Sequence, residues 1–104
     1  MSAEFSIVTT AIDDEAKALE IARAVVEAGL AACTHITPIR SVYRWKGRID
    51  EAQEFRLDMK MRSADYAALE AAILRLHSYE TPQIIRIDIA GGHAAYLAWL
   101  AAKA

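Results

Sequence analysis

Cys33 and His35 stand two residues apart in a run whose pattern favours extended chain. Side chains two apart on a strand point to the same side of a sheet, so the thiol and the imidazole should lie next to each other. One sulfur and one nitrogen form a ligand pair suited to copper or zinc. The alternative is that Cys33 packs as a small buried apolar residue, as free cysteines commonly do. A metal bound by this pair needs further ligands from elsewhere.

A second group of titratable side chains lies in the segment HSYETP, residues 77–82. The segment follows a helical pattern and precedes an extended one, and it contains an imidazole, a phenol and a carboxylate. His77 would close the helix, where the negative end of the helix dipole favours the protonated ring. In the alternative interpretation, the ring turns inward and binds a metal or an anion. The candidate metal ligands of the chain are Cys33, His77, Glu80 and His35.

Other reactive residue types favour ordinary structural roles. Met59 and Met61 could be thioether ligands for reduced copper, but alternate positions on a strand are typical of core residues. Glu51 and Glu54 are three apart on a predicted strand and would face opposite sides, which argues against paired catalytic carboxylates. The sequence contains no nucleophile motif, phosphate-binding glycine loop or zinc-hydrolase helix. We therefore expect neither an enzyme nor an organic cofactor.

Composition predicts one small domain spanning residues 1–104. Hydrophobic residues make up 55% of the chain and charged residues 25%, and the formal net charge is −2. This balance argues against nucleic acid as a partner, because phosphate binding needs a basic face. The sequence shows neither an apolar run long enough for a membrane span nor the pattern of a signal peptide. The single cysteine suits a reducing compartment, so we expect a cytoplasmic protein.

The first predicted elements are a strand over residues 4–10 and the helix that follows it. Asp13 is the expected N-cap of this helix, and Gly29 is its expected C-terminal stop. Between them, apolar residues recur with the 3.6-residue period of a helix. These residues are Leu19, Ala22, Val25, Val26 and Leu30.

Two extended runs joined by the turn Trp45–Arg48 predict a hairpin. The first run, Leu30–Trp45, contains Pro38, which marks an edge, a bulge or a bend because proline donates no ladder hydrogen bond. Apolar and charged residues alternate from Glu54 to Met61 in the second run, so one face should be buried and the other wet. Both arms exceed the usual five or six residues of a strand. Hairpin strands that extend beyond their own domain favour pairing with another subunit.

A second helix, a last strand and a C-terminal helix complete the prediction. Ser63 should cap the second helix, and Pro82 precedes a strand over Gln83–Ala90, after which Gly91 and Gly92 separate it from a short helix. The inward positions of the second helix are Tyr66, Leu69, Ile73 and Leu76. The element order predicts a ferredoxin-like α+β sandwich of βαββαβ order. Its antiparallel sheet would include the long hairpin, and the C-terminal helix would be an addition.

Several stretches together resemble the CutA divalent-cation tolerance proteins. They follow one another in the family's order, with compatible spacing, over nearly the whole chain. They are Leu30–Cys33, Ser41–Gly47, Glu51, Glu54, Lys60–Arg62, Leu76–Pro82 and Tyr96–Trp99. The chain departs from the family at Ser78, where proline is common, and at His35 and His93, where asparagine is common. The roles of these two histidines therefore stay open.

The resemblance implies a cytoplasmic homotrimer associated with tolerance to copper and other divalent cations, with no defined catalytic activity. By position, Cys33 and His77 match family residues proposed around a metal site. The residues that match the lining of an inter-subunit cleft are Tyr43, Trp45, Glu54, Lys60, Tyr79 and Glu80. In an alternative reading, the trimer is a signalling or scaffold protein whose clefts bind a small anionic metabolite. The recognising groups would then be Lys60, Arg62, Tyr79 and Glu80.

Overall fold

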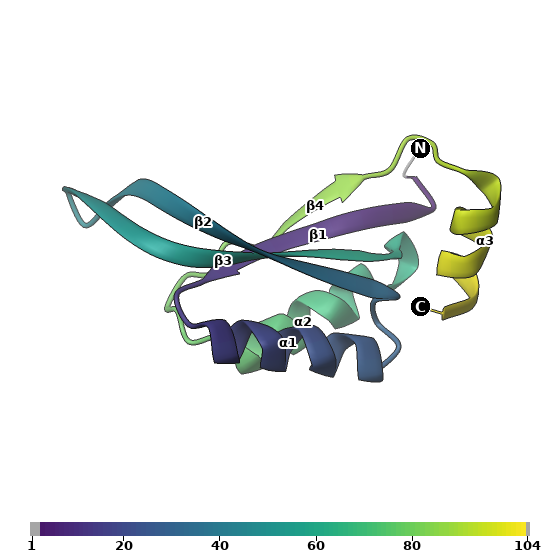
Figure 1. Cartoon of the computed structure of the whole chain (residues 1–104), viewed down its shortest axis with the longest axis horizontal. Helices are drawn as coiled ribbons and strands as arrows, with labels where there is room; N and C mark the ends of the chain where they lie inside the picture. Colours follow the sequence, from purple (N-terminus) through teal and green to yellow (C-terminus); the bar gives the residue numbers. More distant parts are fainter. Residues whose placement is uncertain (1–2, 104) are drawn as a thin grey trace.

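An antiparallel sheet with two helices packed on one of its faces forms the main body of the chain (Figure 1). The computed structural model describes residues 3–103. Its elements are β1 (Phe5–Ile12), α1 (Glu15–Glu27), β2 (Cys33–Trp45), β3 (Arg48–Arg62), a 3₁₀ turn (Ser63–Asp65), α2 (Tyr66–Leu76), β4 (Ile85–Asp88) and α3 (Ala94–Lys103). In this described part, no helix is both long and apolar enough to cross a bilayer.

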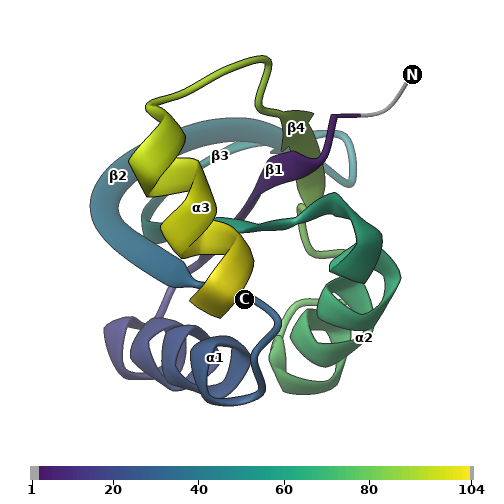
Figure 2. The same cartoon turned by 90° about the vertical axis from the view of Figure 1, so that its right-hand side faces the viewer.

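The strands are ordered β2-β3-β1-β4, and each neighbouring pair is antiparallel. With α1 and α2 on one face, this is the predicted ferredoxin-like α+β sandwich. The helix α3 is the predicted addition, and it lies at the end of the sheet away from the hairpin tip (Figures 1 and 2). The long hairpin is confirmed, with 13 residues in β2 and 15 in β3.

The core lies between the sheet and the two helices, and β3 contributes to it at every second residue. Leu57, Met59 and Met61 are fully buried, which confirms the predicted alternation and places both methionines in the core. The apolar stripe of α1 is rotated relative to the prediction, because Leu19 and Val26 are exposed. The fully buried residues that the helices contribute include Ala18, Ile21, Val25, Leu69 and Ile73.

Local hydrogen bonds cap both ends of α1. At its start Asp14, and not the predicted Asp13, accepts the backbone N–H of Lys17 at 3.2 Å, as N-cap carboxylates do. At its end Gly29 adopts φ +73°, and the two N–H groups that follow the cap bond back to carbonyls of the last turn. This pattern is a Schellman motif, so Gly29 is confirmed as the stop.

A two-residue turn closes the hairpin and fixes its register. Lys46 and Gly47 both have positive φ, 51° and 79°, which is the pattern of a type I′ turn. The pairing then runs without interruption from this turn to Cys33, which lies opposite Lys60. Pro38 lies inside β2, which is an edge strand where a missing N–H is tolerated.

Three predicted boundaries differ from the structure. The first strand continues to Ile12, because β1 pairs with β3 over its whole length. Ser63 does not cap α2 but opens the 3₁₀ turn, where its hydroxyl lies 2.6 Å from that of Ser6. The last strand covers Ile85–Asp88 and not Gln83–Ala90, because β4 pairs with only four residues of β1.

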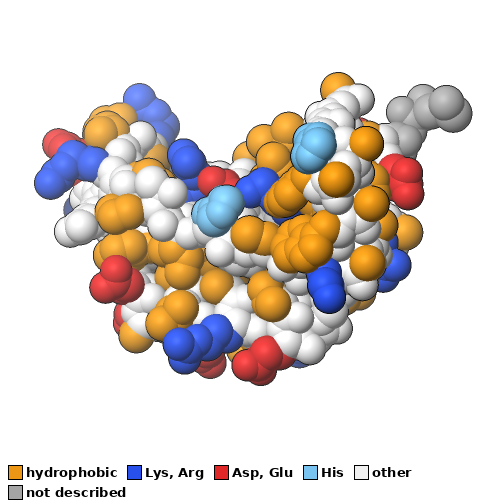
Figure 3. All heavy atoms as spheres, turned by 45° about the vertical axis from the view of Figure 1, so that its right-hand side comes forward, with side chains coloured by type: hydrophobic (Ala, Val, Ile, Leu, Met, Phe, Trp, Pro, Cys, Tyr) orange, Lys and Arg blue, Asp and Glu red, His pale blue; other side chains and the backbone are white. Residues whose placement is uncertain are grey.

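The face of the sheet away from α1 and α2 carries exposed apolar residues. In the register Ile87 lies beside Ile7, and Ile7 lies beside Lys60, so these side chains share the face opposite the core. Ile85 and Ile87 are each about half exposed. Figure 3 shows a concave surface between the hairpin and α3, with hydrophobic side chains gathered over α3. An uncovered apolar face of this kind favours association with another chain.

Candidate functional site

Cys33 and His35 lie side by side on the uncovered face of the sheet. The Sγ of Cys33 is 3.6 Å from Nε2 of His35, the proximity that their spacing predicted. Nδ1 of the same ring is 3.1 Å from Nζ of Lys60. Because an ammonium group only donates, Nδ1 is the acceptor and the ring proton sits on Nε2, facing the sulfur. The thiol is half-buried and the imidazole is exposed, so an ion can reach both from solvent.

The separation of these two atoms is compatible with one shared metal ion. With bonds of about 2.3 Å from zinc to sulfur and about 2.0 Å from zinc to nitrogen, two tetrahedral ligands lie about 3.6 Å apart. The observed distance is 3.6 Å. Among residues 3–103, no group of three or more His, Cys, Asp or Glu could hold a metal. The chain by itself therefore offers half of a coordination shell.

His77 lies elsewhere, and the structure uses both of its ring nitrogens. Nε2 donates to the carbonyl oxygen of Ala11 at 2.9 Å, and Nδ1 accepts the backbone N–H of Tyr79 at 3.1 Å. The ring is turned inward as a neutral tautomer, and neither nitrogen keeps a free lone pair for a metal. His77 is thus neither a charged helix end nor an open ligand in this chain.

The four predicted metal ligands are not brought together within the chain. Cys33 pairs with Lys60 of β3, which in turn lies beside Ile7 of β1. His77 bonds instead to Ala11, about 13 Å further along β1. Glu80 is exposed in the loop after α2, and His93 is exposed just before α3. Of the predicted set, only the thiol–imidazole pair is in contact.

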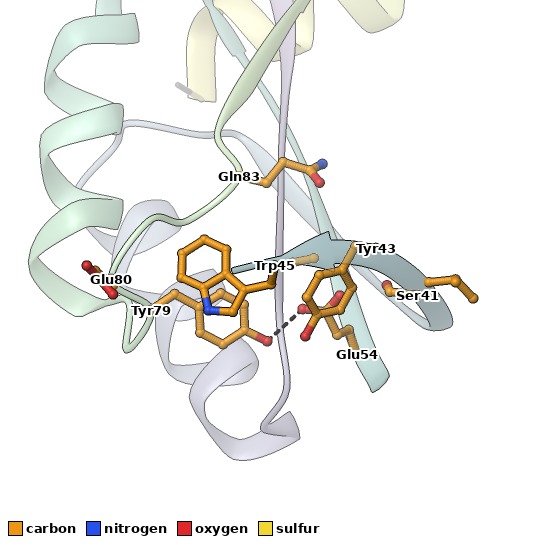
Figure 4. A pocket seen from close by; sticks show the side chains of 9 residues that line it. Ser41, Tyr43, Trp45, Glu54, Tyr79, Glu80 and Gln83 are labelled. Atoms are coloured by element: carbon orange, nitrogen blue, oxygen red, sulfur yellow. Dashed lines mark hydrogen bonds between the residues drawn. The ribbon is translucent and has the colours of Figure 1, made fainter. Parts of the chain in front are cut away.

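A hollow of about 640 Å³ lies between the hairpin and the loop after α2 (Figure 4). Ser41, Tyr43 and Trp45 alternate along β2 and share one face, and Glu54 of β3 lies on that face. The loop contributes Tyr79 from the other side, together with Glu80 and Gln83. The volume falls in the range of small-molecule sites.

Glu54 and Tyr79 make a direct polar contact in this hollow. The Tyr79 hydroxyl donates to Oε2 of Glu54 at 2.6 Å, and Glu54 is only 8% exposed. Burial raises the pKa of Tyr79, and the hydrogen bond and negative charge of Glu54 raise that pKa further. The phenol is therefore a neutral donor at physiological pH.

The burial of Glu54 contradicts the expectation that the charged face of β3 is wet throughout. The loop after α2 covers Glu54, whereas Arg56 on the same face is exposed. The two partners are 25 residues apart, and no local pattern links them. Only the family resemblance, which assigned both Glu54 and Tyr79 to a cleft, could have suggested the contact.

The residues expected to line one cleft divide into two groups. Tyr43, Trp45, Glu54, Tyr79 and Glu80 all line the hollow. Lys60 contacts His35 instead, and Arg62 pairs with Asp65 at 3.0 Å. No lysine or arginine of the described chain lines the hollow, which contains two carboxylates. The basic groups expected to recognise an anionic metabolite are thus absent from this lining.

Comparison with known proteins relates these features to one family. Residues 6–103 match the model of the CutA1 divalent ion tolerance protein. The chain is 39% identical over 95 residues to the divalent-cation tolerance protein CutA of Thermus thermophilus, covering 90% of this chain and 92% of that protein. It is 41% identical over 88 residues to protein CutA of Mus musculus, covering 84% of this chain but only 50% of the mouse protein. The chain belongs to the CutA1 family.

Solved CutA structures share the fold described above. CutA1 of Shewanella sp. SIB1 superposes with a TM-score of 0.96 at 34% identity, over 100% of this chain and 98% of that one. CutA of Archaeoglobus fulgidus superposes with a TM-score of 0.93 at 33% identity, over 95% and 97%. The Archaeoglobus protein is described as periplasmic, so a cytoplasmic location for this CutA1 chain stays a prediction.

Replacing Tyr79 by Phe should lower the free energy of unfolding by about 1–3 kcal/mol, because Oε2 of Glu54 would stay buried without its donor. Chemical denaturation at neutral pH measures this loss. Tyr43→Phe is the matched control, since the Tyr43 hydroxyl lines the same hollow but makes no hydrogen bond with residues 3–103. Equal losses in the two variants would contradict the assignment.

The same pair of variants tests the pKa of Tyr79. Because this pKa lies above the usual 10.0 in the folded chain, the unfolded chain releases its proton first, and stability falls as the pH rises above about 10. This fall should be shallower in Tyr79→Phe than in Tyr43→Phe. An identical alkaline slope would show that Tyr79 ionises normally.

Proposed function

We propose that the protein acts in divalent-cation tolerance by binding copper or zinc through Cys33 and His35, without catalytic turnover. The observation that carries this proposal is the 3.6 Å separation of Sγ and Nε2 on an accessible face of the sheet. A thiolate and an imidazole are soft ligands, so copper and zinc should bind in preference to magnesium. Bound there, the metal would be cargo, held by the two side chains and removed from solution.

A homotrimer in the cytoplasm is the second part of the proposal. Two features support self-association: the exposed isoleucines of β4 and the free edge of β2, which presents unpaired backbone groups along a 13-residue strand. Such an edge is suited to strand addition by another chain. Association would also bring further side chains toward the thiol–imidazole pair, which needs more ligands than one chain supplies.

The ammonium group of Lys60 disfavours metal binding at this pair. Its ammonium group lies 3.1 Å from Nδ1 of His35 and holds the ring proton on the nitrogen that faces Cys33. Metal binding at Nε2 requires that proton to move to Nδ1, the atom that Lys60 contacts, and the bound ion would place a second positive charge near Lys60. Lys60 would therefore have to move from the ring when a metal binds.

Titration of reduced, metal-free protein with zinc tests the proposed ligands. Zinc is redox-inert, so it leaves the thiol reduced. We expect saturable binding that weakens by at least about tenfold in Cys33→Ala and in His35→Ala, as loss of one ligand predicts. His93→Gln removes an exposed imidazole outside the pair and should bind as the parent does. In the same titration Lys60→Gln should bind about fivefold more tightly, because a nearby positive charge is removed.

Two results of this titration would overturn the metal proposal. One is the absence of saturable binding, and the other is unchanged affinity in both ligand variants. Weaker binding in Lys60→Gln would also count against it, because that result would mean the ammonium group helps to hold the ligand.

Sedimentation equilibrium of the metal-free protein tests the assembly separately. We expect a stable species of three times the 11.5 kDa of one chain. A folded 11.5 kDa species at micromolar concentration would refute the trimer and would leave the remaining metal ligands without a source.

A further inference from the structure

The hollow between the hairpin and the loop after α2 combines aromatic rings with a buried negative charge. Tyr43, Trp45 and Tyr79 supply the rings, and Glu54 supplies a carboxylate that is 8% exposed. Oε2 of Glu54 accepts from Tyr79, while Oε1 receives no hydrogen bond from residues 3–103. We propose that this hollow binds an organic ammonium ion, whose cationic head lies among the aromatic rings and against Oε1 of Glu54.

The charge of the lining favours a cation over an anion or a neutral ligand. The Glu54 carboxylate accepts one hydrogen bond, from Tyr79, and has no basic partner among the described lining residues. Oε1 is not among the buried side-chain atoms that lack a partner, so a ligand can reach it, and a bound cation would supply the counter-charge that the lining lacks. Glu80 lies at the edge of the hollow with its side chain directed away from Glu54 (Figure 4), so it adds negative potential there and not a direct contact.

The aromatic rings favour an organic cation over an inorganic one. Ring faces attract alkylammonium groups through cation–π interactions and bury their carbon atoms at the same time. A hard metal ion would need six or more oxygen ligands, and a hollow of about 640 Å³ with two carboxylates does not supply them. A molecule of several carbon atoms carrying one ammonium group fits both the volume and the lining.

The chain itself already places a cation on one of these rings. Nζ of Lys46, at the hairpin turn, lies 5.7 Å from the centroid of the Trp45 ring. The ring is therefore positioned to attract positive charge, and Lys46 competes with or repels an incoming ammonium group. Removing the charge of Lys46 should strengthen binding of a cation and weaken binding of an anion, so the sign of this effect identifies the charge of the ligand.

This site is separate from the proposed metal pair. Trp45 stands at the turn end of β2, whereas Cys33 is its first residue at the other end. The thiol and imidazole contribute nothing to the hollow. Ammonium binding in a Cys33→Ala variant should match that of the parent protein, so either proposal can fail without the other.

NMR titration of the full chain with choline tests the inference. The indole N–H of Trp45 is the reporter, in a Trp99→Phe background that leaves Trp45 as the one tryptophan. The control ligand is the uncharged isostere of choline in which carbon replaces the quaternary nitrogen. We expect choline to give a saturable shift of the Trp45 signal and the isostere to bind at least about tenfold more weakly, as loss of a desolvated cation–π contact and charge pairing predicts.

Two variants assign the binding to the proposed groups. Glu54→Gln keeps an acceptor for the Tyr79 hydroxyl but removes the charge, and it should weaken choline binding by at least about tenfold. Lys46→Gln removes the ammonium group that lies over the Trp45 ring and should strengthen choline binding by about threefold. If Glu54→Gln fails to fold, as judged by circular dichroism, Lys46→Gln decides the question alone.

Three outcomes would overturn the inference. The first is no saturable shift of Trp45 with either choline or tetramethylammonium. The second is equal affinity for choline and its uncharged isostere, which would show an apolar hollow without charge preference. The third is weaker choline binding in Lys46→Gln, which would show that the turn lysine assists the ligand and does not oppose it.

Discussion

The register of the β2–β3 hairpin is the constraint on which both candidate sites depend. The type I′ turn sets Trp45 opposite Arg48, and every later pair follows from it. At the far end, Cys33 and His35 share a face because they lie two residues apart on β2, and the same register sets Lys60 beside them. A slip of β2 by one residue would turn Cys33, His35 and Trp45 to the face opposite Lys60 and Glu54 of β3, so neither site would form as described.

The loop after α2 covers the end of β1 and so completes the hollow that contains Glu54. Strand β4 pairs with β1 only as far as Thr9, so the last residues of β1 lack a neighbour on that side. His77 fills part of this gap by donating to the carbonyl of Ala11, and its ring is held by the N–H of Tyr79. The phenol of Tyr79 then reaches Glu54. Two of the titratable groups in this short joint thus have a structural role, since His77 and Tyr79 bond the loop to the sheet, whereas Glu80 is exposed.

The sequence predicted the features that follow from the alternation of side chains along a strand. Alternation along β3 identified the buried face, and the spacing of Cys33 and His35 predicted their contact. The alternation of residues along β4 did not show which of its faces meets the helices, and Ile87 in fact points to the uncovered side of the sheet. Nor could it foresee the burial of Glu54 or the inward bonds of His77, because both depend on the course of a loop that no local pattern fixes.

X-ray absorption spectroscopy of the zinc-loaded protein tests most directly whether Cys33 and His35 form a metal site on this face of the hairpin. We expect a sulfur neighbour at about 2.3 Å, together with nitrogen at about 2.0 Å and the outer-shell scattering of an imidazole ring. These two ligands would come from Cys33 and His35, which lie two residues apart on β2 with 3.6 Å between Sγ and Nε2. A shell made only of oxygen and nitrogen, with the Cys33 thiol reduced and free, would contradict the account.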